Sequence, residues 1–228
     1  MKAPDHPLDR PAWHALSAHQ ADLAVGDSRA RRFPPDVSPF AAAPDDTPQS
    51  AAALAALLPQ GAELALIQAH VPPLPEGLDL IHDAICLQML WSDFRHTASD
   101  IVPVPLTDSD AADMRVLAEL TKPGPFYART HILGRFVGVR KGGKLVAMAG
   151  ERLHPAGFTE ISAVCTHPDH RGQGFATALM RTVGANIIAR GETPFLHLYA
   201  DNEGAMALYK SLGFAPRREM QFSIWARP

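Results

Sequence analysis

The segment 167–177 holds the residues whose types and spacing best suit the binding of a charged ligand. It reads His-Pro-Asp-His-Arg-Gly-Gln-Gly-Phe-Ala-Thr and lies between an apolar run typical of a strand and a run with helical periodicity. Closely spaced glycines let the backbone approach a ligand, and the unpaired N–H groups at the start of the helix attract anions. Arg171 adds a fixed positive charge. The segment therefore predicts a phosphate-binding loop.

Other interpretations of this loop are weaker. A Walker loop is excluded because no Gly-Lys-Ser/Thr follows, and the dinucleotide fingerprint fails at its third glycine, where Thr177 stands. A plain strand-to-helix turn stays open as the commoner use of glycine.

A second motif, 202–214, reads Asn-Glu-Gly-Ala-Met-Ala-Leu-Tyr-Lys-Ser-Leu-Gly-Phe. Together the two segments resemble the GNAT superfamily of coenzyme A-dependent N-acyltransferases, whose pyrophosphate loop has the form Arg/Gln-x-x-Gly-x-Gly/Ala. Arg171, Gly174 and Ala176 fit that form, and the second motif matches closely. The resemblance covers residues 101–228 and is greatest to the branch of glycine N-acyltransferase-like proteins. It implies transfer of an acyl group, most commonly from acetyl-CoA, to a primary amine by direct attack in a ternary complex.

The resemblance also implies where the coenzyme binds. Acyl-CoA would enter a gap between two diverging strands, Ile161–Thr166 and Phe195–Ala200. Its pantetheine amides would pair with the free strand edge at Val164 and Thr166. The implied coenzyme-binding residues are Val164, Cys165, Thr166, Arg171, Gly172, Gln173, Gly174, Phe175, Ala176, Thr177 and Asn202. For Asn202, capping of the following helix is an equally good role.

Acyl transfer to an amine needs a base, because an alkylammonium with a pKa of about 10.4 is mostly unreactive at pH 7. Glu160 lies 11 residues before Arg171, the spacing at which the family often carries its carboxylate base. The open alternatives are an ordered water as the base and a strand-end carboxylate paired with a nearby arginine. Strand alternation predicts one face with Glu160, Ser162, Val164 and Thr166, and another with Ile161, Ala163 and Cys165. Cys165 is therefore not expected to be a partner of Glu160.

Tyr209 stands where the family places the tyrosine that protonates the departing CoA thiolate. Without the motif, it would be a core tyrosine on an amphipathic helix with Leu208 and Leu212. His197 and Tyr199 lie on the strand beside the expected gap, where acceptor contact, packing and surface exposure are all open.

The sequence does not predict a metal site. Cys165, His167, Asp169 and His170 have ligand-like spacing, but Pro168 interrupts any helix and no second ligand pair lies nearby. Two cysteines, Cys86 and Cys165, are too few for a disulfide framework.

The elements that must position these residues form a regular series after residue 100. The expected strands are Ile101–Leu106, Phe136–Val139 and Lys144–Ala149 as a hairpin, Phe158–Thr166, Pro194–Ala200, Phe214–Met220 and Gln221–Trp225, and the expected helices are Ala111–Leu120, Tyr127–Leu133, Phe175–Ala189 and Ala205–Leu212. Before residue 100, Trp13–Ala24 and Ala51–Leu58 are expected as helices, and Glu63–Ala69 and Ile81–Trp91 as strands or buried helices. The fold class is α/β (α+β), with a mixed, mostly antiparallel sheet flanked by helices.

Charge divides the chain in the same place. Residues 1–100 carry 6 basic and 13 acidic side chains, a net charge of −7, whereas residues 101–228 carry 15 and 11, a net charge of +4. The total of −3 disfavours nucleic acid as a partner. No apolar run approaches the roughly 20 residues of a membrane span, so a cytoplasmic protein is expected.

Two units are predicted, 1–100 and 101–228. The second is the acyltransferase unit, and the first is either a degenerate half of the same fold or a cap over the acceptor site. A small-molecule amine and a peptide amine both suit the acceptor role, and a monomer and a homodimer fit equally well. A CoA-binding regulatory or sensor module without acyl transfer is the alternative function.

Overall fold

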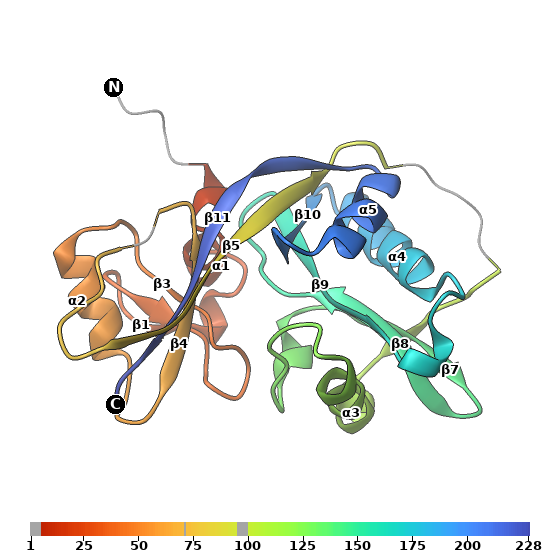
Figure 1. The fold of residues 1–228 in the computed structure, drawn as a ribbon, viewed down its shortest axis with the longest axis horizontal. Helices are drawn as coiled ribbons and strands as arrows, with labels where there is room; N and C mark the ends of the chain where they lie inside the picture. The colour runs from red at the N-terminus through yellow and green to blue at the C-terminus, as the bar shows by residue number, and fades with distance from the viewer. Residues whose placement is uncertain (1–5, 71, 95–99) are drawn as a thin grey trace.

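The computed structural model describes residues 6–70, 72–94 and 100–228. Most of its strands belong to one twisted sheet of eight strands in the order β4-β11-β5-β10-β9-β8-β7-β6, and three short strands form a small second sheet (Figure 1). The strands are β1 (Val25–Gly26), β2 (Arg31–Arg32), β3 (Ala41–Ala42), β4 (Glu63–Gln68), β5 (Asp79–Trp91), β6 (Val104–Leu106), β7 (Phe136–Lys141), β8 (Lys144–Glu151), β9 (Phe158–Thr166), β10 (Thr193–Tyr199) and β11 (Phe214–Ala226).

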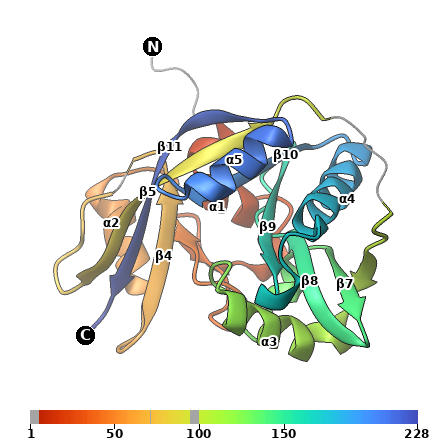
Figure 2. The same ribbon diagram turned by 45° about the vertical axis from the view of Figure 1, so that its right-hand side comes forward.

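Helices cover both faces of the large sheet (Figure 2). They are α1 (Pro11–Leu16), α2 (Pro48–Ala56), α3 (Ala111–Thr121), α4 (Phe175–Ala189) and α5 (Glu203–Ser211). Leu179 of α4 and Leu208 of α5 pack against one apolar cluster, whereas Met114 of α3 and Leu16 of α1 belong to two other clusters. Among the described residues, no helix is long and apolar enough to cross a membrane.

The strand β5 comes from the front of the chain but lies in the middle of the large sheet. It pairs with β10 through Tyr199 and Cys86 on one side, and with β11 through Phe222 and Ala84 on the other. The expected division near residue 100 therefore does not coincide with a division between sheets. The front residues add β4 and β5 to the sheet and place α1, α2 and the small sheet beside it.

Several expected elements are confirmed. Strand β9 and helix α4 have the expected bounds, and β7 and β8 form the expected hairpin. Gly142 and Gly143 form its turn with φ of +55° and +80°, which suits glycine at both positions. The confirmed elements thus include β9 and α4, the strand and the helix on either side of the glycine loop.

Three expectations are wrong. The last two strands are one strand, β11, because bulges near Arg217 and Ile224 bend it without ending its pairing with β5. Helix α1 ends at Leu16, and Gln20 beyond it turns its side chain inward to the carbonyls of Leu133 and Arg152. The helix expected from Tyr127 is only the 3₁₀ turn Thr130–Leu133, because the Thr130 hydroxyl accepts from Tyr127 N–H and donates to a carbonyl of the front segment.

Candidate active site

A cavity of about 590 Å³ lies between the glycine loop, β9 and α5. Its lining includes ten of the residues expected at the coenzyme, together with Tyr209. These residues are Val164, Cys165, Thr166, Arg171, Gly172, Gln173, Gly174, Phe175, Ala176 and Thr177. The structure therefore brings the two sequence motifs to one cavity.

The gap between β9 and β10 opens where their pairing stops. The two strands are parallel partners only up to the pair Phe195 and Glu160. Beyond it, β9 stays with β8 and β10 stays with β5. His167 N–H donates to Val146 O on the β8 side. Backbone alternation then turns the amides of Thr166 and Val164 toward the open gap, as expected for a free strand edge.

The glycine loop presents unpaired donors to the cavity. Gly172 and Gly174 have φ of +74° and +77°, and Gly174 is the N-cap of α4 with no side chain capping the helix. The N–H groups of the first turn of α4 thus remain available for an anion. Arg171 is exposed, and no ion pair to it exists among residues 6–70, 72–94 and 100–228.

Tyr209 lines the cavity from α5 and packs against the apolar cluster beneath α4. Burial raises the pKa of its phenol, so the side chain keeps its proton at neutral pH. Asn202 caps α5 by accepting a hydrogen bond from Ala205 N–H at 3.0 Å. It is absent from the cavity lining, so its expected contact with the coenzyme stays a prediction.

A bulge in β9 overturns the expected alternation of its side chains. Met148 and Gly150 of β8 face Cys165 and Ser162, so three residue steps on β9 oppose two on β8. Ala163 has a φ of +53°, the left-handed conformation that places the extra residue. As a result Ile161 and Val164 both pack beneath α4. Glu160, next to Ile161, therefore lies on the face opposite Val164, and the prediction that the two share a face is wrong.

Glu160 is fully buried and bonded through both carboxylate oxygens. Arg152 donates from Nε to Oε2 at 2.8 Å and from Nη2 to Oε1 at 2.5 Å, and His197 Nδ1 lies 2.6 Å from Oε1. Burial raises the pKa of Glu160, but the Arg152 guanidinium and His197 outweigh it and lower the pKa to about 2. The carboxylate is therefore charged at every pH at which the protein would work.

The polar chain continues from His197 through the sheet to the front segment. Gln88 of β5 donates from Nε2 to Leu8 O and lies 2.9 Å from His197 Nε2, while its Oε1 accepts from Arg217 at 2.8 Å. Arg217 also pairs with Asp9 at 2.7 Å. Because Gln88 uses its oxygen for Arg217, its amide donates to His197 Nε2, and His197 donates from Nδ1 to Glu160. With these donor and acceptor roles, each of these side chains has a hydrogen-bond partner.

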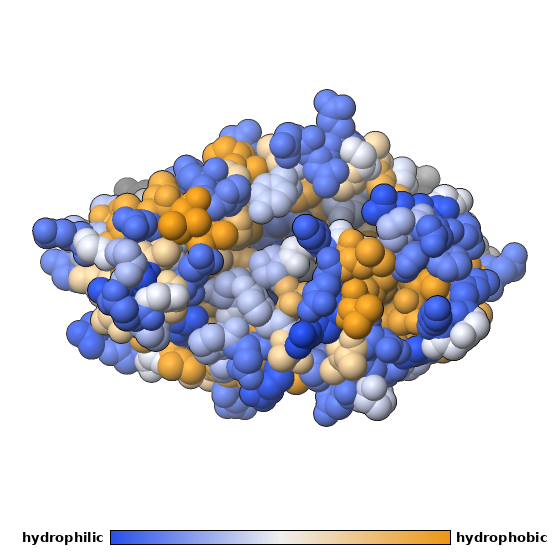
Figure 3. Space-filling view, turned by 60° about the horizontal axis from the view of Figure 1, so that its bottom comes forward, coloured by the Kyte–Doolittle hydropathy of each residue, from blue (hydrophilic) through white to orange (hydrophobic). Residues whose placement is uncertain are grey.

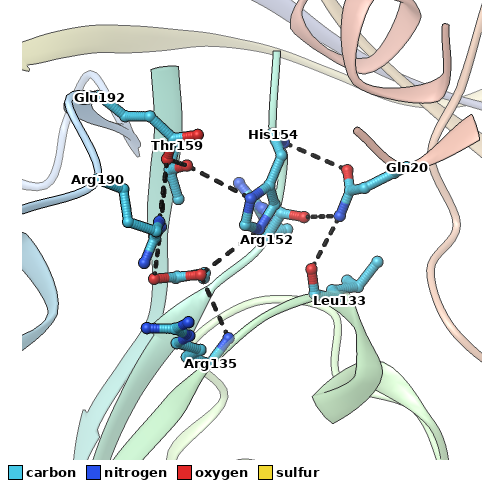
Figure 4. A network of polar contacts seen from close by, with 9 residues as sticks. Gln20, Leu133, Arg135, Arg152, His154, Thr159, Arg190 and Glu192 are labelled. Atoms are coloured by element: carbon cyan, nitrogen blue, oxygen red, sulfur yellow. Dashed lines mark hydrogen bonds and ion pairs between the residues drawn. The ribbon is translucent and has the colours of Figure 1, made fainter. Parts of the chain in front are cut away.

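A second buried network, drawn in Figure 4, holds the backbone of Arg152. The side chain of Gln20 donates to the carbonyl of Arg152 at 2.7 Å and accepts from the N–H of His154 at 3.2 Å. Nearby, Arg190 donates to Glu151 at 3.0 Å. The front segment therefore fixes the arginine that neutralises Glu160.

Sequence reasoning missed Arg152, Gln88 and Arg217. Arg152 follows β8 at no motif position, and its eight-residue separation from Glu160 spans a turn whose geometry the sequence does not specify. The signal that existed was the general expectation that a buried carboxylate needs a cationic partner. Within the described ranges, no three of the histidine, cysteine, aspartate and glutamate side chains gather where they could hold a metal ion.

A sheet opened between two parallel strands, with a glycine loop and helix N-terminus at its mouth, is the architecture of an acyl-CoA-dependent transferase. The model of the FR47-like protein family matches residues 136–223. A solved chain from Novosphingobium aromaticivorans, described as an acetyltransferase of the GNAT family, is 42% identical with a TM-score of 0.92, and the match covers 98% of this chain and all of that one. The chain therefore belongs to the GNAT family of acetyltransferases.

More distant relatives share the fold or part of the sequence. A GCN5-related N-acetyltransferase from Kribbella flavida, 18% identical over 95% of both chains with a TM-score of 0.62, shares the fold. The N-alpha-acetyltransferase RimI of Mycobacterium tuberculosis is 38% identical over 82 residues, which are 35% of this chain and 51% of that protein. The chain thus spans about half the length of this curated relative. The expected α+β fold and superfamily are confirmed, and the glycine N-acyltransferase-like branch stays a prediction.

Proposed function

We propose that this GNAT acetyltransferase transfers the acetyl group of acetyl-CoA to a primary amine by direct attack within a ternary complex. The observation that carries the proposal is the cavity of about 590 Å³ on which the glycine loop, the free edge of β9 and Tyr209 converge. One substrate that needs an anion site, an amide-pairing edge and a proton donor together is an acyl-CoA thioester.

Acetyl-CoA is held by two of its parts, the charged pyrophosphate and the pantetheine arm. The free N–H groups at the start of α4 and the guanidinium of Arg171 take the pyrophosphate. The amides of Val164 and Thr166 pair with the pantetheine arm, as a ligand strand pairs with a sheet edge. Asn202, beyond its capping bond, adds a hydrogen bond to the same arm.

During acyl transfer, negative charge develops on the thioester oxygen and on the leaving sulfur, and both charges must be stabilised. The backbone amide of Val164 donates to the thioester oxygen as the amine attacks the carbonyl carbon. When the tetrahedral intermediate collapses, the C–S bond breaks and Tyr209 protonates the leaving thiolate. A raised pKa supports this role, because it keeps the phenol protonated until the sulfur becomes basic.

Deprotonation of the amine proceeds through an ordered water. Glu160 was expected to be the base, but a carboxylate with a pKa of about 2 and both oxygens bonded is a weak proton acceptor. The buried ion pair instead supports a positioning role, in which Glu160 fixes Arg152 and His197 behind the gap. The front segment, through Gln20 and Leu8, braces the same residues.

Calorimetry and an acetylation assay test the proposal together. We expect acetyl-CoA and CoA to bind with micromolar affinity, and thiol release from acetyl-CoA to depend on an added primary amine. Absence of binding at millimolar acetyl-CoA would refute the proposal. Binding without transfer to any amine of a broad panel would instead indicate a CoA-responsive sensor.

A further inference from the structure

A second cavity of about 560 Å³ lies where β10 ends and β5 continues in its pairing with β11. The last pair of these strands joins Tyr199 to Cys86, after which Ala200 N–H bonds Ile85 O and the chain leaves the sheet. The next residue of β5 on the same face is Ala84, whose small side chain leaves room above the strand. The cavity is lined by His82, Ala84, Ile85, Tyr199, Ala200 and Asp201.

This cavity opens on the face of the sheet opposite α4 and α5. Leu198 packs in the cluster beneath α4, so its neighbour Tyr199 points to the other face. Cys86, the pairing partner of Tyr199, belongs to the cluster of the front segment. Glu160 lies on this face too.

Only two residues separate the linings of the two cavities along the chain. Asp201 lines the second cavity, and Gly204 lines the donor cavity. Three peptide links hold their Cα atoms within about 11 Å of each other. The linings of the two cavities therefore approach each other at the start of α5.

Aromatic rings form one wall of the second cavity. The ring of His82 lies 6.2 Å from that of Tyr199 and 5.7 Å from that of Phe222, and Tyr199 lies 6.1 Å from Phe222. All three pairs pack edge to face or nearly so, and Tyr199 is 45% exposed. An electron-rich ring face beside an opening attracts organic cations.

Asp201 supplies negative charge at the same place. Within residues 6–70, 72–94 and 100–228, its carboxylate has no hydrogen bond or ion pair, and its side chain is exposed. Burial, then Cys86, raises the pKa of Tyr199 against an opposing effect of Arg152, and Asp201 adds to the rise. Arg152, which also acts on the Tyr199 phenol, is paired with Glu160 at 2.5 Å. Asp201 thus brings a negative charge to the lining of the cavity.

We propose that this pocket binds a cationic group of the acceptor other than the attacking amine. The preferred acceptors are then primary amines with a second positive charge, such as aliphatic diamines and basic amino acids. The inference rests on the proposed acetyl transfer. The attacking nitrogen must lose its proton, whereas an aromatic face and a carboxylate hold a cation, so the two amino groups need different surroundings.

The test compares 1,4-diaminobutane with n-butylamine, which has the same carbon chain and one charge. Each is titrated by calorimetry into the protein saturated with CoA, and again into the free protein, since the pocket exists without a donor. We expect a Kd for the diamine that is about tenfold lower. Asp201→Asn and Tyr199→Leu should each reduce the difference to under about threefold, and Tyr199→Phe should retain it.

Glu219→Gln is the matched control, because Glu219 is an exposed carboxylate of β11 next to the buried Met220 and so lies on the opposite face. It should leave both affinities unchanged. Equal affinities of the two amines for the wild-type protein overturn the inference, as does a preference that survives both Asp201→Asn and Tyr199→Leu. Equal affinities together with normal acetyl transfer leave the proposed function intact, whereas diamine binding without acetyl transfer refutes the proposed function alone.

Discussion

The Oε1 atom of Glu160 and the Nδ1 atom of His197 lie 2.6 Å apart across the point where β9 and β10 separate. Glu160 belongs to the last parallel pair of these strands, and His197 lies two residues beyond that pair on β10. This hydrogen bond therefore joins β9 to β10 at the point where the gap between them begins. With Arg152 on its other side, the carboxylate ties three chain segments together at the origin of the donor cleft.

Replacement of Glu160 by glutamine should destabilise the fold. The change leaves the buried Arg152 guanidinium without its counter-charge, and breaking a buried pair typically costs about 3–5 kcal/mol. Urea denaturation measures this loss in the free energy of unfolding. Glu219→Gln removes an exposed carboxylate and should change stability by less than about 0.5 kcal/mol. Equal small losses in both variants would contradict the importance of the buried pair.

Acid should unfold the wild-type protein in a definite range. The folded-state pKa of Glu160 is about 2, below its ordinary value of 4.5, so the folded state binds this proton more weakly than the unfolded state. Its stabilisation is complete above pH 4.5 and is lost as the pH falls toward 2. The expected loss is about 3 kcal/mol from this group. Glu160→Gln should show a correspondingly smaller change in stability between these pH values.

The pH dependence of turnover distinguishes a positioning role of Glu160 from a role as base. If water carries the proton, Glu160→Gln lowers kcat but leaves the half-maximal pH of kcat/KM unchanged, because the amine sets that pH. If Glu160 accepts the proton itself, the variant reacts only with amine that is already deprotonated. The half-maximal pH of kcat/KM then moves upward by one unit or more. Profiles of wild type and variant between pH 6 and pH 10 separate the two results.

Tyr209→Phe should reduce kcat by about two orders of magnitude, because the thiolate then leaves without a positioned proton donor. The dissociation constant for CoA should change less than about threefold, since the ring remains in its apolar contacts. Tyr127→Phe is the control, because Tyr127 lines neither of the two described cavities. A wild-type kcat in the Tyr209→Phe variant would show that the phenol takes no part in the reaction.

Gly172→Ala and Gly191→Ala separate backbone strain from ligand contact. Both glycines have left-handed backbones, with φ of +74° and +80°, and an added Cβ meets nothing within 4 Å at either position. Each change should cost about 1 kcal/mol of stability. Only Gly172 lines the donor cavity, so only Gly172→Ala should weaken CoA binding in calorimetry. Equal CoA affinity of the two variants would place the coenzyme elsewhere.

Local patterns in the sequence predicted which residues the structure brings together around the first cavity. The apolar periodicity of α4, the glycines before it and the Asn202 motif depend on neighbouring residues, and the structure brings the glycine loop and Tyr209 to one cavity. The second cavity and the surroundings of Glu160 depend on pairings over long sequence separations. No local pattern places β5 between β10 and β11, and no pattern distinguishes Ala163 as the extra residue of a bulge.

The pairing of Glu160 with an arginine was one of the alternatives that the sequence left open, and the structure confirms it, but the sequence did not identify Arg152 or the face on which the pair lies. Strand alternation assumes one residue per step, so a single bulge transfers Glu160 to the other face of β9. Arg152 and Gln88 then become its neighbours through the packing of three strands and the front segment. A candidate base thus became one member of a buried ion pair.

The central place of β5 imposes an order on synthesis. A ribosome releases β5 before either of its neighbours, because β10 and β11 are translated at least a hundred residues later. Until residues 193–226 emerge, both edges of this thirteen-residue strand lack their native partners. Unpaired edges invite association with other chains, and contacts so distant in sequence form slowly. The sheet can close only when residues 193–226 have been synthesised, so β5 is exposed to such association until then.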